Sequence, residues 1–134
     1  MFHKTDVSDW GQLEDVFKVC ETEFGSVPDI VVPGAGVYEP SFNGFWDDVD
    51  ERSHYQLFDI NLLHPIKMTR MAVRRMRQAN KPGVILHLSS ISAQMPSITV
   101  PLYAVSKAGI SQFVRSMATL EELAGIRVVA VAPG

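Results

Sequence analysis

The stretch GVILHLSS, residues 83–90, is an apolar run that opens at a glycine and closes at two serines. A run of this length between turn residues is typical of a strand buried inside a sheet. Similar stretches lie on either side of it in the sequence, DIVVPGAG at 29–36 and GIRVVAVAPG at 125–134. We therefore predict three buried strands, each of which runs into a turn of small residues.

Helical segments separate these strands in the sequence. Residues 52–79 and 102–124 are predicted to form two long helices. A shorter helix over 10–24 can begin after Asp9, a capping residue, and stop at Gly25. Apolar strands that alternate with helices indicate an α/β fold, a parallel sheet with crossover helices. We expect the whole chain to form a single domain.

Three further segments have less regular patterns. Residues 1–7 are predicted to be the end of a short strand. Residues 37–50 contain a proline and a glycine and are predicted to be a loop, as are residues 91–101 between the second strand and the next helix.

The composition excludes several classes of function. The 134 residues are 46% hydrophobic and 20% charged, which is ordinary for one globular domain. A net charge of −3 argues against a nucleic-acid or anionic-membrane surface. We expect the basic cluster within 52–79 to be a solvated helix face. Its members are Arg70, Arg74, Arg75 and Arg77.

The cysteine count, the apolar runs and the histidine spacing indicate the cellular compartment and whether a metal is bound. A single cysteine, Cys20, cannot form an internal disulfide, and it is expected to be a small packed residue. The sequence has no apolar run long enough for a membrane span and no signal-peptide core, so a cytoplasmic protein is expected. The four histidines lack metal-ligand spacing, and we predict no metal site.

The predicted strands place their carboxyl ends together. Ligands of such sheets bind beyond the carboxyl ends of the strands. Those ends read PGAG at 33–36, SSIS at 89–92 and APG at 132–134, and we expect them to line one crevice. The GAG turn would allow a ligand close to the backbone, although a purely structural turn is the better explanation of this stretch by itself.

Three side chains of complementary chemistry should meet at that crevice. Tyr103 and Lys107 are four residues apart and share one helix face, and Ser90 ends the preceding strand. A hydroxyl and a phenol suit a carbonyl or alcohol oxygen, because one can orient it while the other exchanges its proton. An ammonium group beside a phenol favours the phenolate. Tyrosine and lysine at this spacing also occur merely as surface residues of helices.

A polar residue interrupts the apolar arc of the predicted helix 52–79. Asn61 lies within that arc and needs a partner for its amide. Pro65, four residues later, has no N–H, so the carbonyl of Asn61 loses its helical bond and could hold a water. A simple proline kink with a satisfied core asparagine is the alternative.

Taken together, these motifs resemble the short-chain dehydrogenase/reductase family over the whole chain. The resemblance implies a doubly wound, Rossmann-like NAD(P)-binding domain. It also implies hydride transfer between NAD or NADP and a secondary alcohol or ketone, with Tyr103 transferring the proton. Ser90 would hold the substrate oxygen, and Lys107 would contact the nicotinamide ribose and tune the tyrosine. Asn61 would keep a relay water through its main-chain carbonyl.

The resemblance also implies where the cofactor lies. Asp6 and Val7 would contact the adenine. The glycine turn 34–36 (Gly34, Ala35 and Gly36), together with Tyr103 and Lys107, would hold the cofactor in the crevice. The two residues that would flank the nicotinamide are Pro133 and Gly134.

The sequence departs from the family pattern in two ways. Pro33 stands where the family has an asparagine, and it can neither brace the sheet through an amide nor donate a ladder bond. The family's glycine-rich phosphate loop, T-G-x-x-x-G-x-G, has no counterpart in the sequence. We therefore expect a domain truncated at both ends, which lacks its first βαβ unit and, beyond Gly134, its last strand, and whose strand 29–36 forms an exposed apolar edge. An inactive isolated chain is one outcome that this expectation allows.

Two functions remain open at this point. The chain is an enzyme of the resembled family, or it is a non-catalytic binding or oligomerisation module. In the resembled family the helices corresponding to 52–79 and 102–124 form the subunit interface, which implies a homodimer or homotetramer. The crevice would take a small alcohol or ketone, and the apolar segment before Tyr103 favours a hydrophobic one.

Overall fold

The computed structural model describes residues 1–39, 45 and 55–134. Within them, β1 (Ile30–Val31), β2 (Gly83–Leu88) and β3 (Ile126–Val131) form one parallel sheet in the order β1-β2-β3. β2 pairs with both neighbours and is therefore central. The predicted α/β fold with a parallel sheet is confirmed. Most of the predicted loop 37–50 and the start of the predicted helix 52–79 lie outside the described residues.

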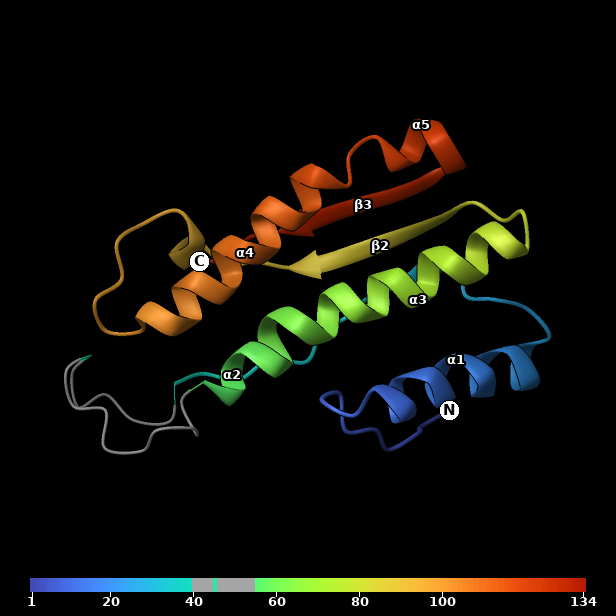
Figure 1. Cartoon of the computed structure of the whole chain (residues 1–134), viewed down its shortest axis with the longest axis horizontal. Helices are drawn as coiled ribbons and strands as arrows, with labels where there is room; N and C mark the ends of the chain where they lie inside the picture. Colours follow the sequence, from blue (N-terminus) through green and yellow to red (C-terminus); the bar gives the residue numbers. More distant parts are fainter. Residues whose placement is uncertain (40–44, 46–54) are drawn as a thin grey trace.

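The helices form a layer over this sheet. The three longest in the described part are α1 (Trp10–Phe24), α3 (His64–Gln78) and α4 (Pro101–Ser116). In Figure 1, α3 lies between α1 below it and α4 above it. Since the strands lie in sequence order, right-handed crossovers put α3 and α4 on the same face of the sheet. The arrowheads of β2 and β3 point toward the first turn of α4 and the C-terminus (Figure 1).

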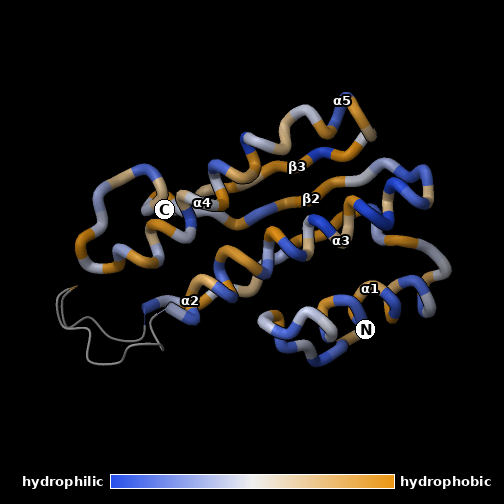
Figure 2. The backbone as a smooth tube through the Cα atoms, viewed as in Figure 1, coloured by the Kyte–Doolittle hydropathy of each residue, from blue (hydrophilic) through white to orange (hydrophobic). Residues whose placement is uncertain are grey.

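The main core lies between this helical layer and the sheet. In Figure 2, apolar and polar segments alternate along α3, as expected for a helix with one buried face. The core side chains come from two helices and all three strands. They are Leu13 and Phe17 of α1, Met71, Ala72 and Met76 of α3, and Val31, Ile85, Ile126 and Val128 of the strands.

The short helix α1 begins and ends as its sequence predicts. The Asp9 carboxylate accepts the backbone N–H of Gly11 at 2.8 Å, and Gly25 closes the helix with a φ of 70°. Residues 1–7 do not form the predicted strand. The backbone of Asp6 is used in the turn before α1 instead, where its N–H donates to Gln12 Oε1 and its carbonyl accepts the N–H of Asp9.

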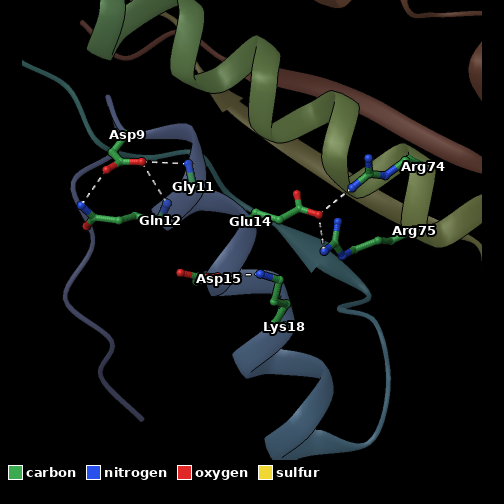
Figure 3. Close-up of polar contacts among 8 residues, drawn as sticks. All are labelled: Asp9, Gly11, Gln12, Glu14, Asp15, Lys18, Arg74 and Arg75. Carbon is green, nitrogen blue, oxygen red and sulfur yellow. Dashed lines mark hydrogen bonds and ion pairs between the residues drawn. The ribbon is translucent and has the colours of Figure 1, made fainter.

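Ion pairs fix α1 against α3. Glu14 Oε1 lies 2.7 Å from Arg74 Nη2 and 2.9 Å from Arg75 Nη2, as Figure 3 shows. Arg75 also pairs with Glu21, and its side chain is only 10% exposed. The prediction that this basic cluster is a solvated face is therefore wrong for Arg75, because the acidic side of α1 covers it.

The predicted helix over 102–124 is interrupted. α4 ends at Ser116, and α5 (Leu120–Ala124) follows after a turn. The Ser116 hydroxyl donates to the carbonyl of Gln112 at 3.0 Å, a contact that competes with the helical bond at that carbonyl. Gly125 then ends α5 with a φ of 66° and leads directly into β3.

Pro33 explains why β1 is so short. Val84 donates its N–H to the backbone carbonyl of Asp29 at 2.9 Å. In the ladder, Ile30 lies opposite Val84, and Val31 lies opposite Ile85. In this parallel ladder the next β1 donor would be the N–H of residue 33, which proline lacks. The strand therefore ends at Val31. β1 is also an edge strand, as predicted, and Ile30 is 64% exposed there.

No helix in the described part of the chain has both the length and the apolar character that crossing a bilayer requires.

Candidate active site

A cleft of about 630 Å³ opens at the carboxyl ends of the strands. The three strand ends predicted to share a crevice do so, and the first turns of α4 close one side. The lining residues are Gly34, Gly36, Val37, Tyr38, Leu88, Ser89, Ser90, Ile91, Ser92, Tyr103, Lys107, Pro133 and Gly134. The cleft therefore brings Ser90, Tyr103 and Lys107 together.

Lys107 is nearly buried at the base of this cleft. Its Nζ donates to the carbonyl of Leu88 at 2.8 Å and lies 5.5 Å from the centre of the Tyr103 ring. Burial disfavours the ammonium form and lowers the pKa of Lys107. The strand carbonyl thus orients the amine, while two of its N–H bonds remain for other partners.

Two adjacent serines at the end of β2 have different partners. Ser89 Oγ donates to the carbonyl of Lys107 at 3.2 Å and lies 2.7 Å from Ser111 Oγ, so it ties the strand to α4. Ser90 Oγ accepts the N–H of Ser92 at 3.2 Å, where it caps the short 3₁₀ helix η2 (Ile91–Ala93). Among the described residues no acceptor binds the Ser90 hydroxyl proton, which is therefore available to a ligand in the cleft.

Asn61 lies directly behind the glycine turn and is 1% exposed. Its side chain makes two 2.8 Å hydrogen bonds to the backbone of Val37: Oδ1 accepts the N–H, and Nδ2 donates to the carbonyl. Nδ2 also lies 3.5 Å from Ser106 Oγ. The amide partner predicted for Asn61 is therefore the loop after β1, and this side chain fixes the wall of the cleft.

The helix around Asn61 widens into a π-helical turn, η1 (Asp59–Leu63), just before Pro65. The backbone N–H of His64 donates to the carbonyl of Asp59 instead of that of Ile60. The Ile60 carbonyl accepts a hydrogen bond from the ring Nδ1 of His64 at 3.1 Å instead. π-Turns of this kind are frequent at functional sites. The sequence predicted the loss of the Asn61 bond but not this wider turn, which connects α2 (Gln56–Phe58) to α3.

The glycine turn leaves room beside the lysine. A Cβ atom at Gly36 would lie 3.5 Å from Asn61 Oδ1 and 3.9 Å from Lys107 Nζ. A side chain there would fill the space in front of the ammonium group. Glycine at 36 therefore keeps this part of the cleft open to a ligand.

Other predicted site residues lie elsewhere. Ala35, Asp6 and Val7 are not among the residues that line the cleft. The carboxylate of Asp6 accepts two bonds from Ser8, which lower its pKa, and Val7 packs against the core. The adenine contact assigned to Asp6 and Val7 stays a prediction.

Sequence reasoning missed two residues of the cleft region. Tyr38 stacks on Tyr103, with ring centroids 4.5 Å apart and an interplanar angle of 36°. Glu39 Oε1 accepts the backbone N–H of Tyr103 at 2.9 Å. Both belong to a segment predicted as a loop. An aromatic and an acidic residue directly after the glycine turn were the available signal.

Comparisons with known proteins identify relatives of this chain. A sequence model described as short chain dehydrogenase matches residues 1–134. Galactitol 2-dehydrogenase of Agrobacterium fabrum is 34% identical over 132 residues, which cover 98% of this chain and 50% of that enzyme. The human 15-hydroxyprostaglandin dehydrogenase [NAD(+)] is 33% identical over 138 residues, covering 100% of this chain and 47% of the relative.

Solved structures show the same fold. A short-chain dehydrogenase from Streptomyces avermitilis superposes with a TM-score of 0.83 at 26% identity, over 98% of this chain and 48% of the other. The chain thus spans about half the length of the relatives it matches.

Proposed function

Because the chain belongs to the short-chain dehydrogenase/reductase family, we propose that its cleft carries out NAD(P)-dependent oxidation of a secondary alcohol, or the reverse reduction of a ketone. The observation that carries the proposal is that Ser90, Tyr103 and Lys107 line one cleft with the glycine turn. A serine hydroxyl, a phenol and a buried ammonium are the groups that this reaction needs at the substrate oxygen.

The residues present fit the nicotinamide end of NAD or NADP. Gly34 and Gly36 leave space at the strand end, and Lys107 has N–H bonds to offer a ribose hydroxyl. Pro133 and Gly134 line the opposite side, where we assign them to the nicotinamide. The name of the human relative specifies NAD(+). When bound, the cofactor accepts or supplies the hydride.

Each of four site residues has a separate role in the proposed reaction. As a phenolate, Tyr103 takes the hydroxyl proton of the alcohol during oxidation, and as a phenol it returns that proton to the substrate oxygen during reduction. Ser90 Oγ donates a hydrogen bond to the same substrate oxygen. Lys107, held by the Leu88 carbonyl, stabilises negative charge on the phenol. The Asn61 carbonyl has no N–H partner at Pro65 and accepts a bond from a relay water.

The substrate is a secondary alcohol or its ketone. The relatives above are named for galactitol and for a 15-hydroxyprostaglandin, both hydroxyl compounds. The segment that enters α4 carries the exposed apolar side chains Met95 and Ile98. Although neither side chain is among those that line the cleft, the apolar character of the segment before Tyr103 supports a hydrophobic substrate.

The test compares turnover of a panel of secondary alcohols by the wild-type protein and by Tyr103→Phe, with NAD or NADP as oxidant. We expect the phenylalanine variant to lose turnover by about 100-fold or more, because it has no proton to exchange. Ser116→Ala, which removes a hydroxyl from the far end of α4, should leave turnover unchanged. A folded wild-type protein without turnover, or a Tyr103→Phe variant as active as wild type, would contradict the proposal.

We also propose that two copies of the chain pair through α3 and α4. Leu63, beside the start of α3, is 44% exposed, and Val105 of α4 is 58% exposed. Apolar side chains on two adjacent helices are typical of a surface that another subunit covers. We expect sedimentation velocity to show a dimer or tetramer that Val105→Glu dissociates. A folded oligomer without turnover would favour the non-catalytic oligomerisation module instead.

A further inference from the structure

We propose that Glu39 and Tyr38 are positioning residues for Tyr103, holding its backbone and its ring in place from the loop after β1. This inference rests on the role assigned to Tyr103 under the proposed function. It concerns two side chains that lie more than sixty residues before Tyr103 in the sequence and meet it only in the fold.

The first turn of α4 needs a cap that its own sequence does not supply. Val100 occupies the N-cap position and has no side-chain acceptor, and Pro101 follows it. Ala104 makes the first helical bond, to the carbonyl of Val100 at 3.0 Å. The N–H of Tyr103 therefore has no helical acceptor, and it donates to Glu39 Oε1 at 2.9 Å. Glu39 caps the helix from another segment of the chain.

Tyr103 is held at two further points. Its carbonyl accepts the hydroxyl of Ser106 at 2.7 Å, and Asn61 Nδ2 lies 3.5 Å from that hydroxyl oxygen. Its ring lies against the ring of Tyr38 at a centroid distance of 4.5 Å. Such an aromatic pair contributes attraction beyond the area it buries. The backbone and the ring of Tyr103 are thus restrained by different neighbours.

The loop segment that carries Tyr38 is itself anchored at the preceding residue. Asn61 binds both backbone groups of Val37, the residue directly before Tyr38. The start of the loop is therefore fixed to the buried η1 turn. A displacement of the phenol by 1 Å is enough to lower the rate of proton transfer severely, so a restraint on Tyr103 bears on catalysis.

The test measures Tyr103 directly by NMR, with or without turnover. In Glu39→Ala we expect the hydrogen-exchange protection of the Tyr103 amide to fall by about fivefold, the usual effect of losing an N-cap. Glu39→Gln keeps an oxygen acceptor and should restore the protection. Ile110, in the buried middle of α4, serves as the control amide and should not change.

The ring contact has its own measurement. In the wild-type protein we expect nuclear Overhauser contacts between the Tyr38 and Tyr103 rings, which require no variant to fold. Tyr38→Leu should shift the Tyr103 ring resonances, whereas Tyr38→Phe should retain them. If turnover is present, Glu39→Ala should lower kcat more than it changes KM, with rescue by Glu39→Gln.

The outcomes separate this inference from the proposed function. No ring contact in wild type, or an unchanged Tyr103 amide in folded Glu39→Ala, would overturn the positioning role even if turnover depends on Tyr103. Turnover that is insensitive to Tyr103→Phe would overturn the proposed function, while the NMR signals would still report the restraint.

Discussion

His87 is a titratable residue buried in the middle of the fold, with no exposed surface. The hydroxyl of Thr69 gives its only proton to the carbonyl of Pro65 at 2.8 Å, so His87 Nε2 must donate to that hydroxyl at 2.9 Å. Nδ1 then carries a lone pair and has no partner within the described residues. Burial, and secondarily the charges of His64 and Lys107, lower the pKa of His87 to about 4.

This histidine predicts a loss of stability in mild acid. The unfolded chain takes up the proton near pH 6.5 and the folded chain only near pH 4, so stability falls as the pH drops through this window. The loss at its acid end amounts to about 3 kcal/mol. Urea unfolding at both ends of the window should show it. In His87→Leu, the difference in the free energy of unfolding between the two pH values should shrink by a similar amount. If that difference stays unchanged, His87 is not the group that causes the loss of stability.

Lys107 offers a second test at a single residue. Burial lowers the pKa of Lys107, whereas the hydrogen bond to Asp15 raises the pKa of Lys18. We therefore expect the Nζ resonance of Lys107 to titrate at a lower pH than that of Lys18 in isotopically labelled protein. Titration of both at one pH would mean that Lys107 is not buried beside the Tyr103 ring.

The site residues differ in how far the sequence could predict them. Ser90, Tyr103 and Lys107 could be predicted because helical spacing and strand ends are local features of the chain. Glu39 could not, because its contact with Tyr103 joins distant segments and follows no periodic pattern. The sequence predicted that the Asn61 side chain would have a hydrogen-bond partner. It did not predict that this partner is the backbone of Val37, because that contact depends on how the loop folds.

At the scale of elements, Pro33 limits the pairing of β1 with β2. Replacing Pro33 with Val supplies the missing N–H opposite Leu86 and should extend the strand. We expect a protected amide at position 33 in hydrogen-exchange measurements, together with slower exchange at Val31. A rapidly exchanging amide at position 33 would show that the backbone there cannot reach the ladder.

The contact between α1 and α3 depends on Glu14, which pairs with two arginines. Glu14→Ala should lower the free energy of unfolding by about 1 kcal/mol, because Arg75 is largely buried and keeps only Glu21. The exposed pair of Lys18 and Asp15 is a matched control, and Lys18→Ala should cost clearly less than Glu14→Ala. Equal losses of stability in Glu14→Ala and Lys18→Ala would mean that the ion pair of Glu14 with the buried Arg75 stabilises the fold no more than an exposed pair does.

Elements with strong local signals were predicted well. The three strands follow from apolar runs, and α1 follows from Asp9 and Gly25. The π-turn before Pro65 was not predicted, because it depends on a backbone N–H changing its carbonyl partner, and the break between α4 and α5 was not predicted either. The expected strand over 1–7 was wrong, since its backbone bonds are made within the turn before α1.

In the folded molecule as a whole, we expect the cleft at the strand ends to hold the nicotinamide end of a cofactor beside Tyr103. A competing place for a phosphate is the groove beside α1 and α3. Its cationic lining residues are Lys67, Arg70, Arg74 and Arg77. A cofactor fragment can therefore distinguish the two surfaces.

The most direct measurement is an NMR titration with reduced nicotinamide mononucleotide, which carries the ring, the ribose and one phosphate. We expect saturable shifts at Gly36, Ser90 and Lys107, and their loss in Lys107→Met. Shifts confined to Arg70 and Arg77 on α3, or no saturable shifts in the folded protein, would contradict this expectation.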